Sequence, residues 1–338
     1  MNRHRHILVV ISSFLLLLAS CSKPDYRDSV LINTNDRTDV NTLFHSLRST
    51  PEVFTVTAGT YSEVRLSKGT RFRFYPHSFK DNSGNILTSG TVRLSVIEMY
   101  STGSALANRS VGLSGNQLLN NTGQVYVTAT MDGVEIGVTK YGIDFYSPVH
   151  SGMPMGLYYG VTDYSDSLVR WMRVGNTAGT AVNATTLDSM SVVVIDTLGT
   201  GVGTVNIYRN YNQFDSCGAL HWVSSQYPAT VTTGLTDISV IPADTLFNSS
   251  NTAVFVVFPD YHMAVPVSNY DSHTHIFSMA VGYNIPLESR IDVVTIGHKN
   301  GLLYYSSQNN VTLTQGMVFS PVMTAHTVTE VLNLLATL

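Results

Sequence analysis

The residues best suited to chemistry are two histidines one residue apart, His273 and His275, with Asp260 and His262 a short distance upstream. Residues two apart on a β-strand share a face, so both imidazoles could bind one zinc or similar ion. A catalytic zinc needs a third protein ligand, which Asp260 or His262 could supply. The alternative is a polar, exposed strand end that happens to carry histidines. We prefer this second interpretation and predict no cofactor.

A second group suited to chemistry is aromatic, because Tyr158, Tyr159, Tyr164 and Trp171 lie close together in the chain. Aromatic side chains beside polar loops can stack on sugars or insert into a partner protein. The alternative is that these rings fill a core and cover sheet edges. We favour the interpretation that these rings fill the core. If they are exposed, the expected partner is an extracellular glycan or protein.

The remaining reactive residues do not form a recognisable catalytic motif. Glu98 and Asp144 fall near expected strand ends, but a glycosidase needs two carboxylates facing each other at a set separation. We expect both to be solvated charges, and Cys217 to be a small buried side chain. The chain has no Gly-x-Ser-x-Gly, His-Glu-x-x-His, phosphate-loop or EF-hand pattern. We therefore predict a protein that is not an enzyme. The alternative is a metal-dependent or carbohydrate-active hydrolase using residues 262–275.

The elements that would position these residues are predicted to be strands. From residue 51 onward apolar residues alternate with polar ones, which is typical of antiparallel strands with one buried face. The apolar positions are Phe54 and Val56, Phe72 and Phe74, Val92, Leu94 and Val96, and Val125, Val127 and Ala129. Turn sequences such as Asp132-Gly133 separate the runs. The pattern predicts an all-β fold with a first β-sandwich over residues 51–150.

The later part of the chain indicates a second body over residues 217–338. The runs 253–258 and 291–296 are apolar on both faces, which predicts central strands, and Lys299-Asn300-Gly301 predicts a hairpin turn. Thr327 and Glu330 form a capping box before a short terminal helix at 328–335. Residues 151–216 are expected to be a β-rich connection. The result is a two-sandwich architecture.

Composition excludes one class of partner. The 338 residues include 19 lysines and arginines against 23 acidic residues, giving a net charge of −4, and only 12% of the chain is charged. A mildly acidic chain has no positive field with which to bind a phosphate backbone. We therefore predict that nucleic acid is not a partner.

The N-terminus predicts a membrane anchor. A basic start, MNRHRH, precedes an apolar run that ends in Leu18-Ala19-Ser20-Cys21. These are the parts of a secretory signal, and the run is too short for a transmembrane helix. The final four residues resemble the lipobox of bacterial lipoproteins. This resemblance implies cleavage after residue 20 and lipidation of Cys21, whose acyl chains would hold the protein to a membrane.

The residues after Cys21 bear on location. Ser22 and Lys23 place no acid beside the cysteine, and Lys23-Pro24-Asp25 is similar to the export tag of surface lipoproteins in Bacteroidota. We expect an outer-membrane lipoprotein that faces outward. Residues 21–50 are expected to be a tether with one short helix over 39–47, docked on the first sandwich.

Two segments resemble a known module. GTRFRFYPHSFKDNSGNILTSGTVRLSVIEM (69–99) and LLNNTGQVYVTATMDGVEI (118–136) are similar to the ZU5-like β-sandwich modules of extracellular Bacteroidota lipoproteins. The shared features are a glycine-led strand, a Pro-x-x-Phe step, Asp/Asn-x-x-Gly turns and a Gly-Thr-Val strand that ends in Glu98. The module that the resemblance implies, residues 51–150, covers about a third of the chain. It implies a sandwich fold and carries no catalytic residue with it.

Overall fold

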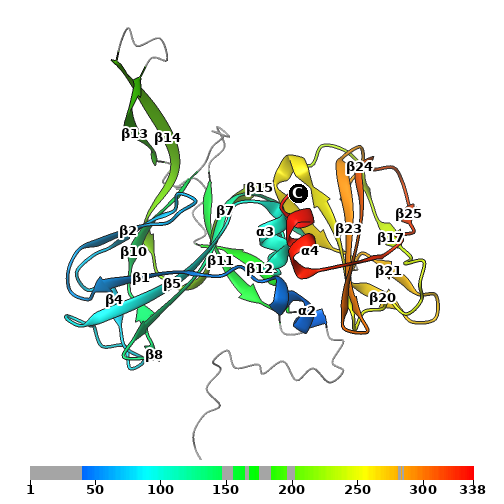
Figure 1. Ribbon diagram of the computed structural model, residues 1–338, viewed down its shortest axis with the longest axis horizontal. Helices are drawn as coiled ribbons and strands as arrows, with labels where there is room; N and C mark the ends of the chain where they lie inside the picture. Colours follow the sequence, from blue (N-terminus) through cyan, green and yellow to red (C-terminus); the bar gives the residue numbers. More distant parts are fainter. Residues whose placement is uncertain are drawn as a thin grey trace, which may run out of the picture. The chain divides into compact units, whose positions relative to one another are not determined.

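The computed structural model describes residues 40–146, 155–163, 167–174, 184–195, 202–280, 283 and 285–338; at residues 41, 184–195 and 202–211 it describes the backbone alone. Strands account for 53% and helices for 10% of the structure. Helix is thus far below the roughly one-third of an average soluble protein. The predicted all-β fold is confirmed (Figure 1).

The largest sheet, called here the large sheet, has eight strands. Its order is β1 (Glu52–Thr57), β5 (Thr91–Met99), β7 (Gln117–Met131), β15 (His221–Pro228), β11 (Gly156–Thr162) and β12 (Val169–Arg173), with β6 (Leu113–Ser114) and β8 (Val134–Glu135) also paired to β7. The six main strands pair antiparallel with their neighbours. Strand β15 belongs to this sheet, although its residues fall in the range that we had assigned to the second body.

A second sheet, the β3–β10 sheet, completes the N-terminal core. Its order is β13 (Ala184–Ile195), β14 (Val202–Cys217), β10 (Tyr141–Tyr146), β3 (Arg71–Phe74) and β2 (Ser62–Arg65); a separate pair joins β4 (Phe79–Lys80) to β9 (Gly137–Val138). Apolar residues from both sheets form one buried cluster, which contains Phe72, Phe74, Val92, Leu94, Val125, Val127, Tyr141 and Ile143. Val92, Leu94 and Val96 are buried while Arg93 is exposed, so the predicted register of β5 is confirmed.

The C-terminal residues form two further sheets. The β18–β23 sheet has the order β19 (Met263–Pro266), β18 (Thr252–Phe258), β23 (Arg290–Lys299), β24 (Leu302–Thr312) and β26 (Thr324–His326). The β17–β21 sheet has the order β20 (Asn269–Asp271), β21 (Ile276–Ser278), β17 (Ile238–Val240) and β25 (Met317–Phe319), and β16 (Leu235–Thr236) pairs with β22 (Ile285–Pro286). The β17–β25 pair is parallel.

Two sequence predictions are confirmed in this region. Strands β18 and β23 lie at the centre of their sheet and are almost entirely buried, as their unbroken apolar runs predicted. Asn300 and Gly301 connect β23 to β24 with φ angles of 53° and 76°. A two-residue hairpin turn of this kind needs positive φ at both positions, which asparagine and glycine tolerate best.

Three α-helices occur in the described part of the chain: α2 (Val40–Leu47), α3 (Thr102–Ala107) and α4 (Val328–Leu335), with a short 3-10 helix η2 at Pro259–Tyr261. Helix α4 begins at the predicted capping box, in which the Thr327 hydroxyl accepts from the Glu330 amide. Helix α2 forms as predicted, but its docking site differs. Phe44 lies edge-on to Phe255 of β18, and α2 contacts β23 and α4. The helix therefore packs on the C-terminal strands, because its Leu43, Phe44 and Leu47 stripe completes their core.

Candidate functional site

The predicted metal ligands lie on different local structures. His273 and His275 fall in the turn between β20 and β21, not on a strand, so the premise that they share a strand face is wrong. The His273 side chain is 94% exposed, whereas His275 Nδ1 lies 2.9 Å from the Tyr270 hydroxyl. Asp260 forms an ion pair with Arg290 at 2.6 Å. Within the described residues no group of three His, Cys, Asp or Glu side chains could share a metal ion.

The predicted stacking residues are mostly interior. Tyr158 and Trp171 are each 1% exposed, which contradicts a role on the surface and agrees with the core interpretation. Trp171 meets Trp222 edge-on, with ring centroids 6.5 Å apart. Gly160, between them in the sheet, makes this approach possible, since a Cβ there would lie 2.5 Å from the Trp222 Cβ. Tyr159 is half-buried and its hydroxyl accepts from the Gly218 amide. Tyr164, like Cys21, lies outside the described residues.

The two carboxylates expected to be solvated are buried. Asp144 has no exposed side-chain surface and accepts hydrogen bonds from Arg71 Nε at 2.6 Å and Arg73 Nη2 at 2.7 Å. Glu98 accepts from the backbone amides of Lys68 and Thr70 at 2.7 and 2.9 Å. Burial raises the pKa of Glu98, and these hydrogen bonds act in the opposite direction. Both carboxylates are thus committed to holding strands and a loop together.

Cys217 is also committed to the scaffold. It is fully buried, as predicted, and its thiol lies 3.6 Å from the Ala219 carbonyl, which also accepts from the Tyr141 hydroxyl at 2.8 Å. Burial raises the pKa of the Cys217 thiol. A nucleophilic cysteine needs the thiolate and access to solvent. Neither condition is met here.

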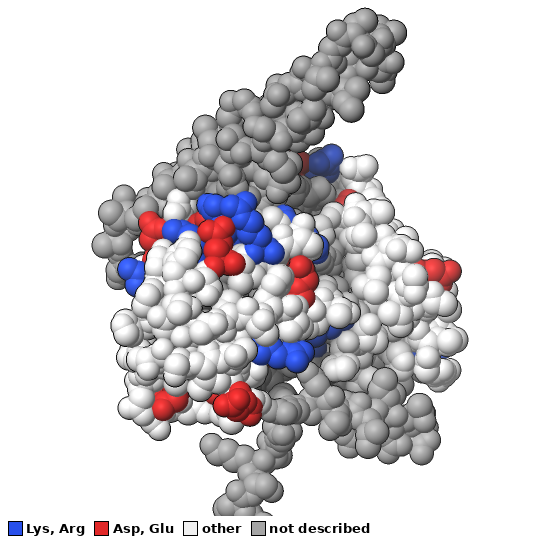
Figure 2. Space-filling view, turned by 60° about the vertical axis from the view of Figure 1, so that its left-hand side comes forward, with Lys and Arg blue, Asp and Glu red and all other residues white. Residues whose placement is uncertain are grey.

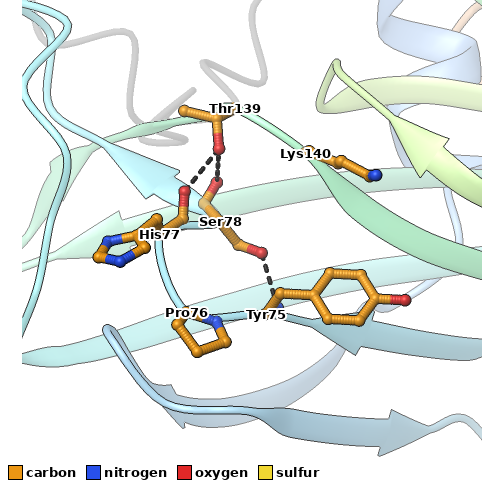
Figure 3. Close-up of a pocket in the computed structure, with 6 residues that line it drawn as sticks. All are labelled: Tyr75, Pro76, His77, Ser78, Thr139 and Lys140. Carbon is orange, nitrogen blue, oxygen red and sulfur yellow. Dashed lines mark hydrogen bonds between the residues drawn. The ribbon is translucent and has the colours of Figure 1, made fainter.

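A pocket of about 320 Å³ opens where two connections meet at the end of the β3–β10 sheet. It is lined by Tyr75, Pro76, His77, Ser78, Thr139 and Lys140 (Figure 3). The first four residues form the turn that leads from β3 to β4, and the last two lead from β9 to β10. The β4–β9 pair brings these two connections together, although more than 60 residues separate them in the chain.

The turn is held by its own polar groups. The Ser78 amide donates to the Tyr75 carbonyl, and the Tyr75 amide donates to the buried Ser78 hydroxyl at 2.7 Å. His77 sits in the left-handed region with a φ of 70°. Thr139 ties the second connection to the first, because its hydroxyl donates to the His77 carbonyl at 2.6 Å and its amide donates to the Ser78 carbonyl. The walls of the pocket are therefore preformed.

The side chains left for a ligand are the Tyr75 ring, the Lys140 ammonium and the exposed His77 imidazole. Figure 3 shows the Tyr75 ring and the Lys140 side chain extending in the same direction from the two connections, with Ser78 between them. The Tyr75 hydroxyl accepts from Arg73 Nη1 at 3.3 Å, and its ring centroid lies 6.0 Å from that of the exposed Tyr61. This arrangement can stack on a ligand and attract negative charge. It does not pair a nucleophile with a base.

The charges near the pocket are mostly balanced in pairs. Arg73 bridges Asp144 and Asp215, and Arg65 pairs with Glu63. Figure 2 shows a similar distribution on one face of the molecule, where basic and acidic side chains lie side by side and wide areas are uncharged. Among the residues that the structure describes, no carboxylate pairs with Lys140.

No protein-family model matches the chain, and no curated protein matches it in sequence. Within the described residues, no helix is both long and apolar enough to cross a membrane. The pocket was not predicted from the sequence. The available signals were Pro76 and the turn residues around it, but the turn gains Thr139 and Lys140 only through the long-range β4–β9 pairing.

Proposed function

We propose that the protein is a lipid-anchored component of the cell envelope that binds a ligand without transforming it. The anchor rests on the lipobox-like Leu18–Cys21 pattern, and an outward-facing position in the outer membrane rests on the residues that follow it. The resemblance to ZU5-like modules supports a surface role. The binding role rests on the preformed pocket between the β3–β4 and β9–β10 connections.

The architecture that we propose for this role is two packed β-sandwiches. The large sheet and the β3–β10 sheet would make the first, because their apolar residues form one buried cluster. The β18–β23 and β17–β21 sheets would make the second, over the cluster that includes Val256, Val294 and Phe277. In this proposal β15 belongs to the first sandwich and α2 to the second.

One observation favours binding over catalysis at this pocket: the Ser78 and Thr139 hydroxyls that line it already hold the two connections together. Ser78 is 1% exposed and its Oγ accepts a hydrogen bond from the Tyr75 amide, while Thr139 Oγ1 donates to the His77 carbonyl. A nucleophile needs a base within hydrogen-bond reach. Neither hydroxyl has a histidine or carboxylate partner in the described part of the chain.

The experiment is a ligand screen with a chemical readout. The soluble body, residues 22–338, is mixed with a panel of monosaccharides, sugar acids and amino acids and followed by saturation-transfer NMR. Compounds that bind are then recovered and analysed by mass spectrometry. We expect binding of at least one class, abolished by Tyr75→Leu, with every compound recovered unchanged. Conversion of any bound compound into a product would show an enzyme instead.

A further inference from the structure

The pocket at Tyr75 and Lys140 is suited to a particular class of ligand. We propose that it binds a sugar unit carrying one negative charge, a carboxylate or a sulfate, with the ring packed on Tyr75 and the anion beside Lys140. This inference rests on the proposed binding function and adds the chemistry of the ligand.

Size and wall chemistry favour a single ring. At about 320 Å³ the pocket is at the lower end of small-molecule sites. Tyr75 is half-buried and its orientation is fixed by Arg73, so little side-chain freedom is lost when a ligand packs on its face. Pro76 adds an apolar surface next to it. An aromatic face beside polar groups suits the C–H face of a pyranose, which a bare inorganic anion would leave unused.

Charge favours an anion. Glu63 is neutralised by Arg65, and both Asp144 and Asp215 bind Arg73. Lys140 is exposed and, among the described residues, has no acidic partner, so it adds a positive charge that these pairs do not balance. An ammonium without a partner at the edge of a pocket attracts a carboxylate or sulfate.

The donor supply favours one negative charge over a phosphate. Phosphate sites use several backbone amides that converge on the anion. Here the amides of Tyr75, Ser78 and Thr139 are all engaged inside the two connections. Lys140 and the His77 imidazole are left as the side chains that can donate to the anion, and with these backbone amides engaged the pocket favours a monoanion.

The test compares D-glucuronate, D-glucose 6-sulfate and D-glucose by saturation-transfer NMR titration of the 22–338 body. For a single sugar unit we expect a Kd on the order of 1 mM for at least one of the two anions. Glucose should bind about 2- to 5-fold more weakly than that anion, and Lys140→Gln should weaken binding of the anion by a similar factor, because one exposed charge interaction is lost. Raising the salt concentration should weaken binding of the anion and leave binding of glucose unchanged.

Two control variants make the result specific. Lys80→Gln removes a lysine from neighbouring β4 that does not line the pocket, and should leave binding unchanged. Tyr75→Phe keeps the ring but loses the hydrogen bond from Arg73 that orients it, so it should retain most of the binding, whereas Tyr75→Leu should lose it. Circular dichroism checks that each variant folds. Equal binding of glucose and both anions, or anion binding indifferent to Lys140→Gln, overturns the charge inference and leaves the binding function standing. Absence of binding by all three sugars overturns this inference, and the wider panel then decides the binding function.

Discussion

Arg73 Nη2 donates to Asp144 Oδ1 at 2.7 Å between the neighbouring strands β3 and β10, and the Asp144 side chain has no exposed surface. Gly142, the strand partner of Arg73, leaves room for the guanidinium, since a Cβ there would lie 2.9 Å from it. Arg71 binds the other carboxylate oxygen of Asp144 at 2.6 Å. One buried acid thus holds two arginines on the outer side of the core residues Phe72 and Phe74.

We predict that Asp144→Ala destabilises the protein by about 3 kcal/mol, because two largely buried guanidinium groups lose the buried carboxylate that they share, and the remaining acid on Arg73, Asp215, is exposed. Urea denaturation of the 22–338 body measures the change. The control is Glu63→Ala, which removes an exposed ion pair with Arg65 and should cost less than about 1 kcal/mol. Equal effects of the two substitutions would show that the buried network contributes no more than a surface pair.

The buried acids also show which features of the fold could not be predicted from the sequence. The alternation that exposes Arg93 and buries Val92 and Leu94 is local, so the register of β5 was readable from the sequence. Asp144 was expected to be solvated because its partners, Arg71 and Arg73, lie 73 and 71 residues away. Glu98 was misjudged for the same reason, since its amide donors are 30 and 28 residues away.

The surface roles considered for the candidate site residues also depended on information that is absent from the local sequence. Alternation says which residues share a face of a strand, but not whether another layer covers that face. Tyr158 and Trp171 are covered, in a cluster with Met99 and Trp222. The prediction that His273 and His275 share a strand face was wrong, because a four-residue turn occupies the place of the expected strand. The pocket forms from the turn after β3 and from the long-range pairing of β4 with β9. Only the turn could be recognised from the local sequence.

Glu98 should give stability a pH dependence. Burial, the largest cause, raises its pKa above the ordinary value of 4.5. The folded protein then holds the proton more tightly than the unfolded chain, so this contribution is complete below pH 4.5 and is lost as pH rises through the folded pKa. Glu98→Gln cannot titrate. We expect the stability of the wild type relative to this variant to fall as pH rises from about 4 to 7. Urea denaturation of both proteins across that range measures the difference in free energy of unfolding. A wild type that gains stability relative to Glu98→Gln as pH rises would contradict the raised pKa.

The proposed anchor predicts that Cys21→Ala moves the full-length protein from the membrane fraction to the soluble fraction, because the substitution removes the site of lipidation. Fractionation followed by immunoblotting measures the shift. Cys217→Ala is the matched control, since this buried cysteine has no part in anchoring. A Cys21→Ala protein that still sediments with membranes would refute the anchor. Protease treatment of intact cells tests orientation separately, and an uncleaved protein would indicate the periplasmic face.

Helices α3 and α4 come from distant parts of the chain and meet at Gly103, where a Cβ would lie 1.8 Å from the Leu335 carbonyl oxygen. The obstacle is backbone, so it cannot turn aside as a flexible side chain would. We predict that Gly103→Ala destabilises the protein by about 2 kcal/mol or more, because the helices must separate. Gly218→Ala is the control, since its Cβ would meet nothing closer than 3.6 Å. Urea denaturation should show a lower midpoint for Gly103→Ala alone. If the two variants unfold together, the close approach of α3 and α4 is not a feature of the folded protein in solution.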